Sequence, residues 1–414
     1  MGRIEELIRE GEAALAPVFA AADEIAYENQ EKVIRAFEKN RIALRHFAPS
    51  TGYGYGDEGR DTLGSLFADI FGAEAGLVSP NLVSGTHALT VGLFGLLRTG
   101  DTLFSVSGDP YDTLLDVISG DGIGSLADYG VRFKKCELKE DGSFDFEAIR
   151  AGLKDPSVRV VFLQRSRGYA WRDALSEAQI GEVCSFVRSC GFFGCIFVDN
   201  CYGEFVERTE PTQNGADIAV GSLNKNPGGG IAPTGGYIVG KKSYIDRIAG
   251  RMTAPSIGAE VGSYAYGYQQ LYQGVFLAPH VVAQAVKGSL LIGRVLRELG
   301  YATSPSAEKL PYDITRAVRF HTKEELCAFI QAVQSASPVD SFVTLEPWDM
   351  PGYADQVIMA AGCFVQGASI ELSADAPIRA PYTAYFQGGL TYEHCKYALK
   401  KILLSLKKSD GVEF

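Results

Sequence analysis

The spacing of hydrophobic residues predicts an N-terminal helical segment followed by a regular alternation of strands and helices. Apolar side chains recur at helical intervals within residues 1–47, a glycine-rich loop follows at 50–60, and helical spacing resumes at 61–71. Short apolar runs then alternate with helical segments, which is typical of a mostly parallel sheet covered by helices on both faces. We expect strands at 76–79, 101–105, 159–164, 195–198, 218–220 and 236–239, and helices at 86–98, 112–118 and 180–189.

The pattern changes in the C-terminal part of the chain. Residues 259–299 have the spacing of one or two long helices. The remainder alternates weaker strands with helices and ends in an amphipathic segment. We therefore predict an α/β protein with a helical segment at 1–47, a large domain at 48–260, and linking helices with a smaller α+β domain at 261–414.

Composition and charge narrow the functional classes. The 414 residues are 46% hydrophobic, and 39 Lys+Arg against 50 Asp+Glu give a net charge of −11. Such a chain can bury a large core without disulfides, and its acidity argues against nucleic acid or an anionic membrane as the main partner. The sequence predicts neither a membrane span nor a signal peptide, so we expect a cytoplasmic protein that acts on a small molecule.

Cysteine and histidine give no sign of a metal site. The eight cysteines form no C-x-x-C pair, and the five histidines are scattered along the sequence. We expect reduced cysteines, as in other cytosolic proteins of this size, and no bound metal.

The first chemically informative feature is the turn Ser84-Gly85-Thr86, which opens the predicted helix at 86–98. Free backbone N–H groups and the positive dipole end of a helix suit a phosphate group. The alternative is a simple helix cap, because serine and threonine are favoured there for capping alone.

Three further residues are expected at the carboxyl ends of strands, where ligands of open α/β sheets bind. Asp199 ends one predicted strand, Lys225 follows the next strand along the chain, and Tyr111 lies beyond an earlier one. Each has an ordinary alternative: a turn carboxylate, a solvated loop lysine and a packing aromatic.

Together these features match the needs of pyridoxal 5′-phosphate (PLP). A lysine forms a Schiff base with its aldehyde, and a carboxylate keeps its pyridine nitrogen protonated so that the ring accepts electrons. An aromatic side chain stacks on the ring, and the helix turn holds the phosphate. Ser222 lies three residues before Lys225, so its hydroxyl can reach the phosphate while the amine reaches the aldehyde. The order and spacing of the set predict a PLP site.

The stretches SGTHAL, VDNCYGEF and GSLNKNPGGGIAPTGG, with GYGYGDEGRD upstream, resemble the aluminium-resistance and methionine gamma-lyase-like proteins. These are a branch of the Cys/Met-metabolism PLP-dependent enzymes. The resemblance implies the aspartate-aminotransferase-like fold (fold type I), with Lys225 carrying PLP, Asp199 facing the pyridine nitrogen and Tyr111 stacking on the ring. It implies phosphate contacts from Ser84, Gly85, Thr86 and Ser222.

The resemblance also implies a residue set shared between subunits. Relatives place an aromatic residue and an arginine across a dimer interface onto the phosphate, which makes Tyr53, Tyr55 and Arg60 the candidates here. Tyr55 and Arg60 are five residues apart, whereas the better-known relatives have a spacing of two. We accordingly expect a homo-oligomer, either a dimer or a dimer of dimers.

An arginine is expected to bind the substrate carboxylate through its planar guanidinium. Arg379 is the first choice and Arg167 the second. Gln164 and Arg165 are expected at the sheet edge beside the cofactor's ring hydroxyl. Surface or structural pairing is the alternative role for each arginine.

The implied activity is a carbon–sulfur lyase that eliminates a thiol from a cystathionine-, methionine- or cysteine-like amino acid and leaves ammonia and a keto acid. Lys225 would take the α-proton, and Tyr111 would protonate the departing thiolate. The same fold also supports aminotransferases and aldolases, and a third interpretation is a non-catalytic stress-response protein. Intact Lys225 and Asp199 favour an enzyme.

Overall fold

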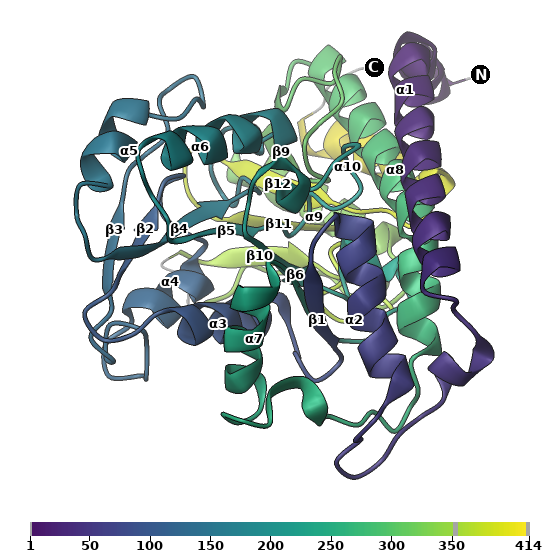
Figure 1. Cartoon of the computed structure of the whole chain (residues 1–414). Coiled ribbons are helices and arrows are strands. Elements are labelled where there is room, and N and C mark those ends of the chain that lie inside the picture. The colour runs from purple at the N-terminus through teal and green to yellow at the C-terminus, as the bar shows by residue number, and fades with distance from the viewer. Residues whose placement is uncertain (1, 351–354, 411–414) are drawn as a thin grey trace.

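The computed structural model describes residues 2–350 and 355–410. The outer ends of the first and third predicted segments, residue 1 and residues 411–414, lie outside this range. A seven-stranded sheet in the order β1-β7-β6-β5-β4-β2-β3 forms the larger part of the molecule (Figure 1). Only β7 runs against the other strands of this sheet. The strands are β1 (Ala75–Ser79), β2 (Thr102–Ser105), β3 (Arg132–Lys135), β4 (Val158–Gln164), β5 (Cys195–Asp199), β6 (Ile218–Ser222) and β7 (Gly236–Gly240).

Both faces of this sheet are buried under helices, which explains why its central strands are almost continuously apolar. On β5, Phe197 packs into one hydrophobic cluster, whereas Ile196 and Val198 pack into another on the opposite face. The first face is covered by α3 (Gly85–Leu96), α4 (Asp112–Ser119) and α7 (Lys242–Met252); the second is covered by α2 (Glu58–Phe71), α5 (Phe146–Gly152) and α6 (Glu177–Ser189).

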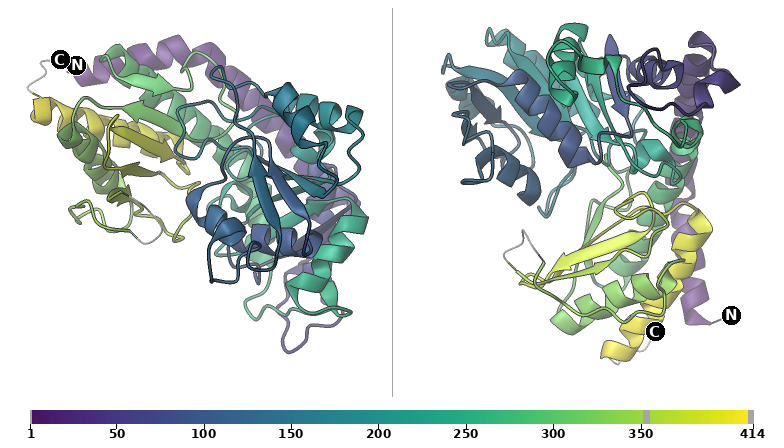
Figure 2. Two further views of the ribbon diagram at one scale, coloured as in Figure 1. Left: turned by 90° about the vertical axis from the view of Figure 1, so that its left-hand side faces the viewer. Right: turned by 90° about the horizontal axis from the view of Figure 1, so that it is seen from below.

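A smaller five-stranded antiparallel sheet has the order β10-β11-β12-β9-β8. Figure 2 shows it beside the large sheet; α9 (Lys323–Ala336) packs against it, and α10 (Tyr392–Asp410) packs against α9 and α8. The domain boundaries near 47 and 260 stay a prediction. The strands are β8 (Ala302–Ser304), β9 (Arg316–Arg319), β10 (Val357–Ala360), β11 (Ser373–Pro377) and β12 (Thr383–Gln387).

Two long helices run alongside both sheets. The 37-residue α1 (Arg3–Lys39) packs against the 30-residue α8 (Gln269–Glu298), as both views of Figure 2 show. Gly11 of α1 permits the close approach, since a Cβ there would lie 3.1–3.2 Å from side-chain atoms of Val295 and Leu291. Helix α8 has the length and apolarity of a membrane span, but 72% of its most apolar window is buried inside the molecule, as in a core helix.

The predicted strands up to residue 240 are all present within two residues of their expected ends. Helices at 58–71, 85–96, 112–119 and 177–189 are likewise confirmed. Strand β3 and helices α5 and α7 were not predicted. β3 has the sequence RFKK and no fully buried residue, so it lacks the apolar signal of a strand.

The predicted helix over 259–299 is wrong for its tyrosine-rich beginning. Residues 261–268 form a loop, and Gly262 and Gly267 have positive φ angles that interrupt a helix. The backbone of this loop instead bonds to the segment before α2: Gly262 N–H donates to Tyr53 O at 2.9 Å, and Tyr268 N–H to Phe47 O at 3.2 Å. The bonded residues are more than 200 positions apart in the sequence, so the local spacing of hydrophobic residues could not predict these contacts.

Candidate active site

Four of the predicted site residues gather at one edge of the large sheet: Gln164, Asp199, Ser222 and Lys225. Strands β4, β5 and β6 are parallel and end there at Gln164, Asp199 and Ser222. Gln164 and Asp199 lie opposite each other in the β4–β5 register. Lys225 follows three residues after Ser222, at the start of a short 3₁₀ turn. The structure therefore brings these predicted residues to the carboxyl edge, where ligands of such sheets bind.

Helix α3 begins beside this edge. Ser84 is its N-cap, and the Ser84 hydroxyl accepts a hydrogen bond from His87 N–H at 3.1 Å. The N–H groups of Gly85 and Thr86 are in the first turn and have no partner within the helix. A Cβ on Gly85 would lie 3.3 Å from Ser222 Cβ, so glycine permits the helix to approach β6 closely. Ser222 Oγ donates to the side-chain oxygen of Asn224.

Tyr111 connects the helix turn with the sheet edge. Its hydroxyl is 2.9 Å from Thr86 Oγ1, and its backbone N–H donates to Gln164 Oε1 at 2.8 Å. Gln164 therefore contacts Tyr111 through its side chain. Burial, with a contribution from Asp199, raises the pKa of Tyr111 well above its ordinary value, so the phenol stays neutral at physiological pH.

Asp199 is 2% exposed. Its Oδ1 accepts a hydrogen bond from Cys201 N–H at 3.1 Å. Burial raises the pKa of Asp199, and the nearby Lys225 and the Cys201 N–H offset this only in part. A cation placed against this carboxylate would therefore be bound strongly in the folded protein.

Lys225 is half-buried, and its Nζ lies 4.2 Å from the centre of the Tyr202 ring. Within the described chain no ion pair joins Lys225 to Asp199. Lys225 nevertheless lowers the pKa of Asp199, and Asp199 raises the pKa of Lys225. Burial alone lowers the pKa of Lys225, but Cys201, Tyr202, Tyr111 and Asp199 outweigh burial and raise the pKa above its ordinary value. Tyr202 was not predicted from the sequence.

The expectation that Arg165 lies beside the cofactor is wrong. Its side chain is fully buried behind the sheet edge and pairs with Glu177 at 2.7 Å and Glu207 at 2.8 Å. It also donates to Asn200 Oδ1 at 2.8 Å, while Asn200 Nδ2 donates to Glu210 at 3.0 Å. This buried network fixes the backbone directly after Asp199, because a charged group in the interior needs specific partners.

Comparison with known proteins gives the family. The family model of methionine gamma-lyase matches residues 4–407. The chain belongs to the methionine gamma-lyase family. It is 48% identical over 410 residues to the uncharacterized protein YnbB of Bacillus subtilis, covering 98% of this chain and 97% of that one. It is also similar to the crystal structure of a candidate cystathionine beta-lyase involved in aluminium resistance from Clostridium acetobutylicum, with 48% identity, a TM-score of 0.95, and coverage of 98% and 95%.

More distant structures share the fold. The PLP-dependent protein YhfS from Escherichia coli has a TM-score of 0.62 at 16% identity, covering 94% of this chain and 97% of that one. The predicted fold type I of PLP-dependent enzymes is confirmed, as is the predicted family.

The two candidate arginines of this family member differ in how their side chains are engaged. Arg379 follows β11, is exposed, and pairs with Asp355 at 3.0 Å. Arg167 is buried, and its guanidinium donates to the backbone and hydroxyl of Ser304 and to Ala170 O at 3.2 Å. Arg167 thus bonds to buried protein groups, whereas the Arg379 side chain lies at the surface.

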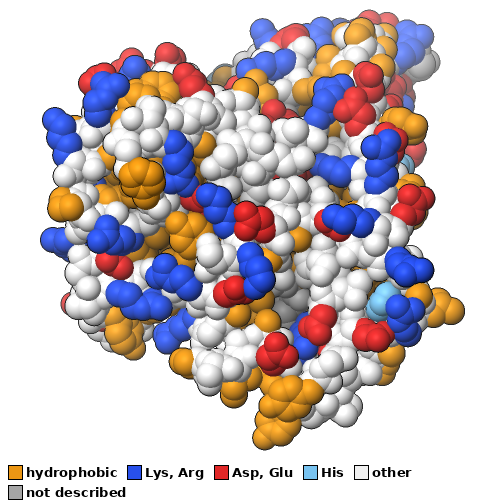
Figure 3. Space-filling model, in the orientation of Figure 1, with side chains coloured by type: hydrophobic (Ala, Val, Ile, Leu, Met, Phe, Trp, Pro, Cys, Tyr) orange, Lys and Arg blue, Asp and Glu red, His pale blue; other side chains and the backbone are white. Residues whose placement is uncertain are grey.

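The segment predicted to cross a dimer interface protrudes from the subunit. Tyr53 is 74% exposed and Tyr55 68%, and hydrophobic side chains project at the bottom of Figure 3, where Figure 1 places the connection from α1 to α2. Arg60 is buried and donates to Gly54 O at 3.0 Å and to Gly262 O at 3.4 Å. In this subunit Arg60 supports the loop, and contact with a partner's phosphate stays a prediction.

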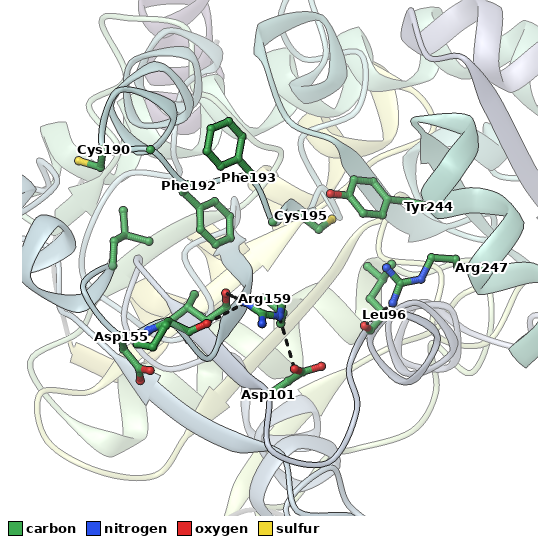
Figure 4. A pocket seen from close by; sticks show the side chains of 15 residues that line it. Leu96, Asp101, Asp155, Arg159, Cys190, Phe192, Phe193, Cys195, Tyr244 and Arg247 are labelled. Atoms are coloured by element: carbon green, nitrogen blue, oxygen red, sulfur yellow. Dashed lines mark hydrogen bonds and ion pairs between the residues drawn. The ribbon is translucent and has the colours of Figure 1, made fainter.

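A large cavity lies at the opposite edge of the sheet. It has a volume of about 520 Å³ and is lined by residues that precede β2, β4 and β5, with Tyr244 and Arg247 from α7 (Figure 4). Arg159 and Asp101 face each other in it at 3.6 Å. The predicted site residues do not line this cavity, so its size does not mark the catalytic site.

Proposed function

We propose that this protein is a PLP-dependent carbon–sulfur lyase, which eliminates a thiol from a sulfur-containing amino acid and releases ammonia and a keto acid. The observation that carries the proposal is the placement of Lys225 and Asp199 at one sheet edge, Asp199 at the end of β5 and Lys225 three residues beyond the end of the neighbouring β6. PLP uses an amine at its aldehyde and a carboxylate at its pyridine nitrogen. The similarity to a candidate cystathionine beta-lyase supports this reaction type.

The surrounding residues fit this cofactor. The first-turn N–H groups of Gly85 and Thr86 point from a helix N-terminus and suit a phosphate. The absence of a side chain at Gly85 keeps that approach open between α3 and β6. Tyr111 lies within hydrogen-bonding distance of Thr86 and would lie against the ring. Asp199 supplies a buried negative charge for a protonated pyridine nitrogen.

When bound, PLP supplies an electron sink for the electron pair at the substrate α-carbon. Lys225 would hold the cofactor covalently at rest and, once displaced by the substrate amine, would accept the α-proton at its Nζ. Tyr111 keeps its phenolic proton because burial raises its pKa. In this proposal that phenol is the group that would protonate the departing sulfur. Asp199 would maintain the positive charge of the ring through the reaction.

An amino-acid substrate and a homo-oligomer complete the proposal. The exposed Tyr53 and Tyr55 stand next to each other, with ring centres 5.7 Å apart, on a loop stabilised by Arg60. Large exposed aromatic pairs of this kind are frequent at interfaces. We propose that this loop completes the phosphate site of a second subunit within a dimer or a dimer of dimers.

A substrate screen tests the proposed reaction. Cysteine, cystine, cystathionine, methionine and homocysteine are each incubated with the PLP-loaded protein, and ammonia, thiol and keto acid are measured in parallel. We expect equal amounts of the three products from at least one substrate. Amino transfer that depends on an added keto acid would identify an aminotransferase, and aldehyde release would identify an aldolase; either result would reject the lyase proposal.

Arg379 is expected to bind the substrate carboxylate. Replacing it with alanine should raise KM for the amino acid by about 10- to 100-fold with a smaller change in kcat, because a charge-assisted pair contributes about 1.5–3 kcal/mol. Arg379→Lys should recover part of the loss. The resting cofactor spectrum should not change, since Arg379 lies in the loop beyond β11 and the predicted cofactor residues lie on the large sheet.

Arg167→Ala is the comparison for this prediction. Arg167 bonds to Ser304 and Ala170, so Arg167→Ala should lower the melting temperature and leave KM close to the wild-type value. A normal KM in Arg379→Ala together with a raised KM in Arg167→Ala would transfer the carboxylate role to Arg167.

A further inference from the structure

Tyr202 occupies an unusual position directly over the Lys225 amine. The centre of its ring lies 4.2 Å from Lys225 Nζ, a distance at which an aromatic ring attracts a cation. Its backbone φ is +75°, a left-handed conformation that costs an L-residue about 1–2 kcal/mol. Strained residues of this kind persist where the surroundings enforce them, and they concentrate at functional sites.

The surroundings of Tyr202 enforce this conformation from both parts of the molecule. Its carbonyl accepts hydrogen bonds from Asn226 Nδ2 at 3.0 Å and from Ile314 N–H at 3.2 Å. Asn226 is the residue after Lys225, so the ring and the lysine turn are held in one geometry. The Tyr202 hydroxyl is 3.2 Å from Ser369 Oγ, in the loop between β10 and β11 of the small sheet.

The loop that carries Ser369 is itself well ordered by hydrogen bonds. The carboxylate of Glu371 is buried and accepts from the N–H groups of Phe364 and Val365, each at 2.9 Å. Gly367 lies next to Asn224, one residue before Lys225, because a Cβ on Gly367 would be 4.0 Å from Asn224 Nδ2. Tyr202 thus lies between the lysine turn and a defined loop of the small sheet.

We propose that Tyr202 is a positioning residue for Lys225: its ring holds the protonated amine at the sheet edge, and its hydroxyl links that contact to Ser369 of the small sheet's loop. The contribution to turnover rests on the proposed lyase function, but the contact itself does not. The other titratable groups that face Lys225 are Cys201, Asp199, Tyr111 and Glu204. They remain unchanged in the variants below.

The test compares Tyr202→Phe, Tyr202→Leu and Ser369→Ala in the full chain without cofactor. Tyrosine, phenylalanine and leucine all bear the same backbone strain at φ +75°, so the three side chains differ only in ring and hydroxyl. Acetic anhydride labels amines at a series of pH values, and mass spectrometry gives the labelling of Lys225 relative to the exposed Lys323. The titration of this ratio reports the pKa of the Lys225 amine.

Tyr202→Leu is expected to lower that pKa by about one unit, because a cation–π contact with a partly desolvated amine has this strength. Tyr202→Phe retains the ring and should retain the wild-type pKa. Both Tyr202→Phe and Ser369→Ala should increase amide hydrogen exchange at 363–369, and the double variant should not exceed either single one. Phe205→Leu is the control, since Phe205 also has a positive φ of 62° but its ring packs against Lys32 and Phe71.

An unchanged Lys225 pKa in a folded Tyr202→Leu protein would overturn the role of the ring, and additive exchange effects would overturn the link to Ser369. Tyr202→Met, which fills similar space, replaces the leucine variant if the latter does not fold. With PLP added, the alkaline limb of the pH profile of kcat in Tyr202→Leu should shift in the same direction as the pKa of the Lys225 amine. Absence of lyase activity in the wild type would reject the proposed function while the labelling result still decides this inference.

Discussion

Replacing Lys225 with alanine is expected to abolish covalent cofactor attachment and to lower kcat/KM for thiol elimination by about 10³-fold or more. The residue has two proposed roles, attachment of PLP and transfer of the α-proton, and the substitution removes the amine that both roles require. Borohydride reduction of the loaded wild type, followed by peptide mass spectrometry, should find the cofactor on Lys225. The variant should show no such adduct.

Lys241→Ala provides the matched control. Lys241 follows β7, which runs antiparallel to β6, so it lies at the opposite edge of the same sheet, where it pairs with Asp217 at 2.7 Å. Its side chain is half-exposed, so its loss should cost at most about 1 kcal/mol of stability and leave attachment and turnover intact. A reducible PLP linkage that survives in Lys225→Ala would show that the lysine assignment is wrong.

Asp199→Asn is expected to lower kcat by about 100-fold or more and to weaken PLP binding. The amide retains the shape and the hydrogen bond from Cys201 but cannot maintain the charge on the pyridine nitrogen. Asp199→Glu keeps the charge at a displaced position and should retain more turnover than the amide. Steady-state kinetics and a cofactor titration followed by absorbance measure both effects.

The stability of the cofactor-free Asp199→Asn protein separates this electrostatic role from a structural one. Burial raises the folded-state pKa of Asp199 above the unfolded value, so its ionisation costs stability as the pH rises through the folded pKa, and the cost is complete above it. The amide avoids that cost, so its free energy of unfolding near pH 7 should be no lower than that of the wild type.

Asp217→Asn is the matched control for this comparison. Asp217 is also a buried carboxylate, but it precedes β6 and bonds to Arg188, Lys241 and Ile196 N–H at the opposite edge. Its replacement should reduce stability and spare turnover. Full activity in Asp199→Asn, or a clear loss of stability in the cofactor-free variant, would contradict the role given to Asp199.

Much of the fold was predictable because the large sheet is buried on both faces. A strand such as β5 must be apolar on every residue up to its end, so the first polar residue, Asp199, marks both the strand terminus and the site. The same reasoning predicted Gln164 at the end of β4 and Lys225 just after the end of β6. β3 was missed because an edge strand has no such requirement, and the loop at 261–268 was misassigned because its conformation depends on bonds to residues near 50.

The sequence by itself determined the family, six of the seven strands of the large sheet, and most of the groups that meet at its carboxyl edge, because burial periodicity and strand termini are local properties of the chain. Only the tertiary structure decided the direction of individual side chains. In the folded chain the Arg165 side chain points into a buried network of carboxylates, and the Tyr202 ring lies over Lys225. Both outcomes depend on partners distant in sequence, such as Glu207 for Arg165 and Ser369 for Tyr202. The local pattern of hydrophobic and polar residues does not show which distant residues come into contact.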